Sequence, residues 1–146
     1  MTDEMIVLAK RAVACKGWRW MSGMLGWRPN NQGVPHSIRF VEGVESMGAL
    51  ASVGTGPLVA SGYATCDGDW RSADITPDLS DPATLGCLLA LVREAWKDPA
   101  LCVVFDTSDG RWHVGRWEDG MSMRGRGGAT EAEALVDALE SAPHTH

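Results

Sequence analysis

The sequence predicts an α+β fold, a single domain over residues 1–146 in which helices pack on an antiparallel sheet. The clearest observation is an amphipathic helix pattern in the centre of the chain, over residues 82–96. The second is a series of three β-rich segments with turn sequences between them, over residues 101–126. A chain of 146 residues can bury such a core without disulfides or metals. The expected order is helix, hairpin and irregular strands, helix, three-stranded meander, helix.

The N-terminal part of the chain predicts a helix followed by a hairpin. Residues 3–15 have helical spacing of apolar residues, and Thr2 is the expected N-cap. Residues 18–21 alternate large apolar and polar groups, as a strand would. Residues 28–33 are typical of a turn, and residues 36–41 are the expected second strand.

Glycines interrupt residues 42–74, and we expect an irregular region there with one strand over residues 58–65. Long ordered loops of compact domains often carry function. This region is therefore the first place at which we expect a working surface.

The central helix has a well-defined start and end. Asp81 is a favoured N-cap residue, and Pro82 suits the first helical position because its missing N–H would have no partner there. The helix is expected to end at Asp98, since the residue before a proline is pushed out of the helical region. Its apolar stripe, which predicts a buried face packed on a sheet, consists of Leu85, Leu88, Leu89, Val92 and Trp96.

The C-terminal part predicts a meander and a last helix. Strands are expected over residues 101–106, 111–117 and 121–126, with turns at 108–110 and 118–120. Thr130 and Glu133 have the spacing of a capping box. Residues 142–146 are expected to form a short flexible tail.

Composition narrows the classes of function. There are 13 basic and 19 acidic residues, a formal net charge of −6, which argues against broad electrostatic binding to nucleic acid or to anionic membranes. We find no signal-peptide pattern and no apolar run long enough to span a membrane, so we expect a cytoplasmic protein. The four cysteines form no C-x-x-C pair, which favours free, mostly buried thiols in a reducing compartment and no metal or other cofactor.

The motifs of common active sites are missing or incomplete. Residues 54–59 resemble the start of a dinucleotide fingerprint, but Val59 stands where its third glycine should be. Residues 125–128 precede the last helix and could hold an anion with Arg124 and Arg126, although a tight turn into a capped helix is the interpretation we prefer.

We expect no catalytic residues. An enzyme would need a pocket that brings His36 or His113 within hydrogen-bond reach of an aspartate.

Seven tryptophans against one tyrosine and two phenylalanines is a skewed aromatic set. Tryptophan is frequent among residues that anchor protein interfaces. The candidates for partner binding are Trp18, Trp20, Trp27, Arg28 and His36.

Three blocks of the sequence carry a resemblance. They are GWRWM at residues 17–21, PDLSDPATLGCLLALVREAW at 77–96 and GATEAEALV at 128–136. Together they resemble small uncharacterised proteins encoded by bacteriophages and prophages, and the last block is similar to the strand–turn–helix ending of phage α/β sandwich domains. The resemblance implies a phage origin and a fold, and it transfers no site residues.

Three hypotheses of function follow. The first is a phage or prophage accessory protein that binds a host protein, such as an inhibitor of a bacterial defence system of the anti-CRISPR or anti-restriction type. The second is a nucleic-acid or nucleotide-binding protein that uses Arg124 and Arg126 together with tryptophans. The third is a small enzyme. Whether the protein forms a homodimer is left open.

Overall fold

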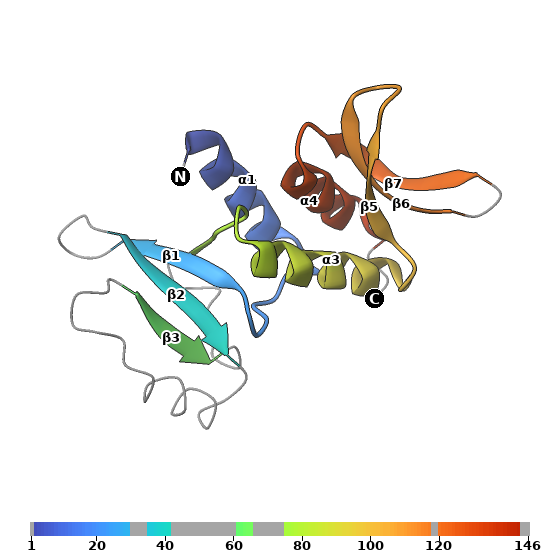
Figure 1. Cartoon of the computed structure of the whole chain (residues 1–146). Coiled ribbons are helices and arrows are strands. Elements are labelled where there is room, and N and C mark those ends of the chain that lie inside the picture. Colours follow the sequence, from blue (N-terminus) through green and yellow to red (C-terminus); the bar gives the residue numbers. More distant parts are fainter. Residues whose placement is uncertain (1, 30–34, 42–60, 66–74, 118–119, 144–146) are drawn as a thin grey trace. The chain divides into compact units, whose positions relative to one another are not determined.

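The computed structural model describes residues 2–29, 35–41, 61–65, 75–117 and 120–143 (Figure 1). These residues form the α+β fold that the sequence predicts. They divide into two compact units, one made of residues 1–19 and 88–146 and the other of residues 20–87. The expectation of a single domain stays a prediction.

The unit of residues 20–87 contains a four-stranded sheet in the order β3-β2-β1-β4. Its strands are β1 (Leu25–Pro29), β2 (Pro35–Val41), β3 (Ser61–Thr65) and β4 (Thr76–Pro77). Strand β1 pairs antiparallel with β2 and with β4, whereas β2 and β3 run parallel. The parallel pair departs from the predicted antiparallel arrangement. A parallel pair needs a long connection, and β2 and β3 are separated in the sequence by residues 42–60.

The predicted hairpin exists, but its first strand lies later in the chain than the predicted residues 18–21. Residues 18–21 form no strand, and β1 begins only at Leu25. Trp18 and Trp20 are buried, so the alternation in this stretch reflects the burial of every second side chain in a connecting segment. Gly26, which interrupts the pattern, is required by packing, because a Cβ there would lie 2.6 Å from Cγ2 of Ile75.

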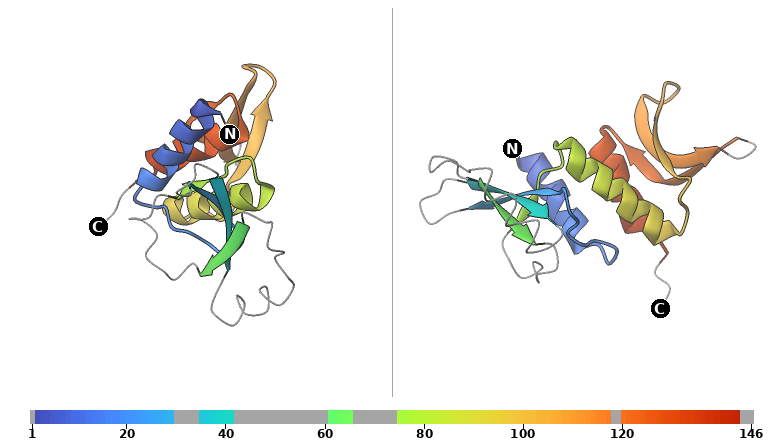
Figure 2. Two further views of the ribbon diagram at one scale, coloured as in Figure 1. Left: turned by 90° about the vertical axis from the view of Figure 1, so that its left-hand side faces the viewer. Right: turned by 60° about the horizontal axis from the view of Figure 1, so that its bottom comes forward.

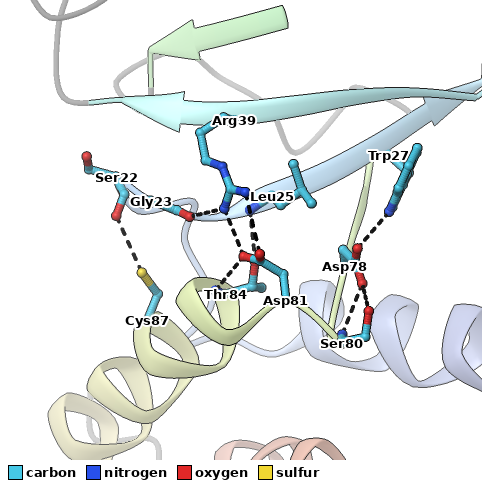
Figure 3. Close-up of polar contacts among 10 residues, drawn as sticks. All are labelled: Ser22, Gly23, Leu25, Trp27, Arg39, Asp78, Ser80, Asp81, Thr84 and Cys87. Atoms are coloured by element: carbon cyan, nitrogen blue, oxygen red, sulfur yellow. Dashed lines mark hydrogen bonds and ion pairs between the residues drawn. The ribbon is translucent and has the colours of Figure 1, made fainter. Parts of the chain in front are cut away.

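Helix α3 (Pro82–Trp96) begins in this unit, and its residues from Leu88 onward belong to the other. Asp81 caps it as predicted, since Thr84 N donates to Asp81 Oδ2 at 3.0 Å (Figure 3). At the other end Lys97 adopts a positive φ of 54°, and the last helical residue is Trp96, two residues before the expected Asp98.

The unit of residues 1–19 and 88–146 holds the predicted meander. Its elements are α1 (Asp3–Ala14), the later part of α3, β5 (Cys102–Asp106), β6 (Arg111–Trp117), β7 (Met121–Gly128) and α4 (Glu131–Ser141). The three strands pair antiparallel in chain order. Helix α4 packs against β6 and β7, and it lies beside the sheet in both views of Figure 2.

The core of this unit lies between the helices and one face of the meander. Its fully buried side chains include Trp18, Leu88, Leu91, Val92, Leu101, Val114, Leu135, Val136 and Leu139. The predicted caps are present, because Met5 N donates to Thr2 Oγ1 and Glu133 N donates to Thr130 Oγ1.

Among the described residues, no helix combines the length and the hydropathy that crossing a membrane requires. Most of residues 42–74, where a working surface was expected, lies outside the described residues. Within that region the structure describes β3, which falls inside the predicted strand over 58–65.

Candidate functional site

The tryptophans proposed for partner binding are buried, or half-buried and hydrogen-bonded within the protein itself. Trp18 and Trp20 are 1% and 6% exposed, so they offer a partner almost no surface. Trp27 is half-buried, and its Nε1 donates to Asp78 Oδ2 at 3.1 Å (Figure 3). Trp18 also belongs to a different compact unit from Trp20 and Trp27.

Arg28 and His36 are opposite each other in the β1–β2 pair. This register confirms that the hairpin brings their backbones together, while their side chains lie outside the described part of the chain. The role of Arg28 and His36 in partner binding therefore stays a prediction.

The structure gives Arg124 a packing role. Its guanidinium carbon lies 5.4 Å from the ring centroid of Trp96, in the geometry of a cation–π contact. Its Nη1 donates to Ser122 Oγ at 2.7 Å, and its Nη2 lies 3.6 Å from Asp98 Oδ2. This arginine is held among neighbours of its own unit.

The N-terminus of α4 is satisfied by the chain itself. Thr130 Oγ1 accepts from Glu133 N, and Glu133 Oε2 accepts from Ala129 N at 3.2 Å. The carboxylates of Glu131 and Glu133 already lie in the first turn, where an external anion would bind. Arg126 is exposed, and its backbone N donates to Asp137. These contacts favour a tight turn into a capped helix over an anion site.

The meander has two faces that differ in what covers them. Side chains of an antiparallel sheet alternate between faces, and residues paired across strands share a face. Val114 pairs with Arg124, so both lie on one face. That face packs on the helices, because Trp96 beneath Arg124 donates its Nε1 to Ala138 O of α4 at 2.8 Å.

The opposite face, which we call the Trp117 face, includes Cys102, Val104, His113, Trp117, Met121 and Met123. Trp117 is the most exposed large apolar side chain of the described residues, at 78%. Met123 on the next strand is 37% exposed, and Met121 is the direct cross-strand partner of Trp117. An aromatic ring therefore stands beside two flexible thioether side chains at this end of the sheet.

A second feature lies at the other end of the meander, at the β5–β6 turn. Asp106, Asp109 and His113 place one ligand atom each within 4.8 Å of one another, and we call them the hairpin cluster. His113 Nε2 lies 2.8 Å from Asp109 Oδ2. Asp106 Oδ1 accepts from both the backbone N and the Oγ of Ser108, at 2.8 and 2.6 Å. These hydrogen bonds lower the pKa of Asp106 below its ordinary value.

Backbone geometry fixes the ring of His113. The residue is only 9% exposed although it sits at a turn-proximal position of β6. Gly127 lies against the ring with φ of 78°, and a Cβ at Gly127 would lie 2.6 Å from His113 Nδ1. Only a glycine permits this approach, and it leaves the imidazole with Nε2 toward Asp109.

The hairpin cluster was not predicted from the sequence. The turn at 108–110 and the isolated His113 are separate signals in the sequence, and neither alone indicates a cluster. In a two-stranded hairpin with this register, Asp106 pairs with Arg111, so His113 is its diagonal neighbour on the same face. The pattern D-x-x-D-x-x-x-H across a predicted hairpin was the signal that could have found it.

The enzyme hypothesis required a histidine near an aspartate inside a pocket. His113 and Asp109 satisfy the distance. A cleft of 460 Å³ in this unit lies elsewhere, and it is lined by Asp3, Glu4, Met5, Val7, Leu8, Arg11, Thr130 and Glu133 of α1 and the α4 N-terminus. The cleft and the hairpin cluster are therefore separate features.

No known protein family matches the chain, and neither a curated protein nor a solved structure matches it.

Proposed function

We propose that the protein acts by binding a partner protein through the Trp117 face of its three-stranded meander. The observation that supports this proposal is the 78% exposure of Trp117 on a regular strand. Tryptophan is among the residues most enriched at the energetic centres of protein interfaces, because a large rigid ring is desolvated at little entropic cost.

The neighbours of Trp117 suit the same purpose. Met121 is the cross-strand partner of Trp117, and the exposed Met123 lies two residues further along β7 on the same face of the sheet. Methionine adapts its shape to a partner surface and contacts aromatic rings favourably. A rigid ring flanked by adaptable side chains, on a strand held by two neighbours of the sheet, is a preorganised binding surface.

The resemblance to phage and prophage proteins motivates the choice of partner. We take the partner to be a protein of the bacterial host, with a component of a defence system as the first class to test, and the site of action to be the host cytoplasm. The formal net charge of −6 supports a protein partner over nucleic acid.

The test is an affinity capture from nuclease-treated host lysate, read by mass spectrometry, with three forms of the full chain. The parent is compared with Trp117→Ser/Met123→Ser and with Val7→Ser. Val7 is the matched control, because it is another highly exposed apolar residue and belongs to helix α1 instead of a meander strand. We expect one stoichiometric host protein that the parent and the Val7 variant retain.

We expect the double variant to lose that protein by more than about tenfold, since truncating an interface tryptophan costs about 2 kcal/mol or more. Its melting temperature should stay close to that of the parent, because both side chains are exposed. A partner that all three forms retain equally would place binding away from the Trp117 face. Capture that disappears on nuclease treatment would favour the nucleic-acid hypothesis instead.

A further inference from the structure

We propose that Asp106, Asp109 and His113 form a binding site for a divalent transition-metal ion, and that Zn²⁺ is the ion that suits them best. Imidazole nitrogen and carboxylate oxygen are both established zinc ligands. Carboxylates alone would favour magnesium or calcium, and the imidazole shifts the preference toward zinc and its neighbours in the first transition row.

The spacing of the three side chains fits one coordination sphere. Their ligand atoms already lie within 4.8 Å of one another. In a tetrahedral site with metal–ligand bonds of about 2.0–2.2 Å, neighbouring ligand atoms are separated by roughly 3.4 Å. Asp109 is exposed and Asp106 is partly exposed, so small side-chain rotations close the remaining gap without moving the strands. Three protein ligands leave one tetrahedral position for water or for a group of a partner.

The histidine is the fixed member of the set. Its ring is buried against the backbone of Gly127, whose lack of a Cβ allows the approach to His113 Nδ1. The residue is only 9% exposed, which limits the movement of the ring, and Nε2 lies 2.8 Å from Asp109 Oδ2. A ligand held in place before the metal arrives lowers the entropic cost of binding.

The charge of the cluster also favours a cation. Asp106 Oδ1 accepts hydrogen bonds from the backbone N and the Oγ of Ser108, and both donors stabilise the negative charge of its carboxylate. Arg111 is the cation closest in sequence, but its Nη2 donates to Gly127 O at 3.2 Å. Two carboxylates and one imidazole at a hairpin end are therefore available to a divalent ion.

The experiment is a zinc titration of the full chain by isothermal calorimetry after removal of metals with a chelator. The tail residues His144 and His146 also carry imidazoles, so every protein carries His144→Gln and His146→Gln. The test variant adds Asp106→Asn and Asp109→Asn, which keep side-chain oxygens for the turn hydrogen bonds. The matched control instead adds Asp3→Asn and Glu131→Gln, two exposed acidic residues of helix first turns.

We expect one zinc ion per chain in the parent and in the control, and an affinity at least about tenfold lower in the test variant. Zinc should also shift the ¹⁵N resonances of the His113 ring, and Mg²⁺ in place of zinc should leave them unchanged. The proposal is overturned if the test variant binds zinc as tightly as the parent, since the metal would then sit at other groups such as the cysteines. It is equally overturned if no zinc binds at 100-fold excess over protein, in which case the cluster is a hydrogen-bonded turn only.

Discussion

Arg39 of β2 and Asp81 before α3 form an ion pair whose Nη1–Oδ2 distance is 2.8 Å (Figure 3). The same arginine donates to Gly23 O at 2.8 Å, and the same aspartate oxygen accepts from the backbone and hydroxyl of Thr84. Thr84 Oγ1 in turn accepts from Leu25 N of β1. The carboxylate of Asp81 therefore caps α3 and also neutralises Arg39, and this ion pair links the start of the helix to strand β2.

Asp81→Ala should lower the free energy of unfolding by roughly 2–4 kcal/mol. The loss of an N-cap costs about 1 kcal/mol, and the loss of a charged hydrogen bond to a partly buried arginine adds about 1.5–3 kcal/mol. Urea denaturation followed by circular dichroism measures the change.

Arg19→Ala is the control for this variant, because Arg19 forms an ion pair with Glu94 in which both side chains are largely exposed. Exposed pairs contribute about 0–1 kcal/mol. Equal losses of stability in the two variants would mean that the contacts of Asp81 do not act together.

The contribution of Asp81 should also depend on pH. Burial raises the pKa of Asp81, but hydrogen bonds from Arg39 and Thr84 outweigh it, and the pKa lies below the ordinary value. A carboxyl whose pKa is lowered on folding stabilises the protein above its unfolded pKa of about 3.9, and this contribution is lost as pH falls through the folded value.

Urea midpoints of the parent and of Asp81→Asn at pH 6 and pH 3 test this expectation. The difference between the two proteins should be largest at pH 6 and should shrink at pH 3. Asparagine keeps the capping oxygen, so the variant isolates the charge. An equal difference in urea midpoint at both pH values would contradict a lowered pKa of Asp81 in the folded protein.

Gly127→Ala should be more destabilising than Gly110→Ala, although both glycines have positive φ, 78° and 69°. At Gly110 an added Cβ meets open space, and the left-handed conformation alone costs about 1–2 kcal/mol. At Gly127 the Cβ also meets the ring of His113, and such overpacking adds about 1–3 kcal/mol.

Thermal unfolding of the two glycine variants checks the difference. The melting temperature of Gly127→Ala should fall further than that of Gly110→Ala, and the His113 ring resonances should move only in the Gly127 variant. The opposite order of the two melting temperatures would show that Gly127 does not position the ring.

Cys15 should resist alkylation in the folded protein. Burial raises the pKa of this thiol to about 11, and its Sγ donates to Arg11 O at 3.3 Å. At pH 8 roughly one molecule in a thousand carries the thiolate, against about one in four for an unperturbed cysteine. Iodoacetamide labelling read by peptide mass spectrometry should be at least about tenfold slower for Cys15 in buffer than in 8 M urea. Similar rates in both conditions would show that the thiol is accessible.

The elements that were predicted correctly are those whose sequence signals lie in a few neighbouring residues. Thr2, Asp81 and Thr130 each cap a helix at the predicted residue, because a cap depends on a few neighbouring residues only. The meander strands were found because their turns are local as well.

What the sequence did not predict depends on contacts between distant segments. Strand β4 pairs with β1, and β2 pairs in parallel with β3, although long stretches of sequence separate the members of both pairs. The exposure of Trp117 and the burial of Trp18 and Trp20 depend on how segments distant in the sequence pack. Composition treats all seven tryptophans alike.

The end of β7 alternates arginine and glycine, and evolution should constrain these two kinds of position unequally. Gly125 and Gly127 both have φ of 78°, and a Cβ at Gly125 would lie 3.3 Å from Ala138 of α4. Arg126 between them is exposed. Purifying selection for the fold should therefore keep the two glycines invariant in any descendant of this gene, while position 126 drifts freely among polar residues.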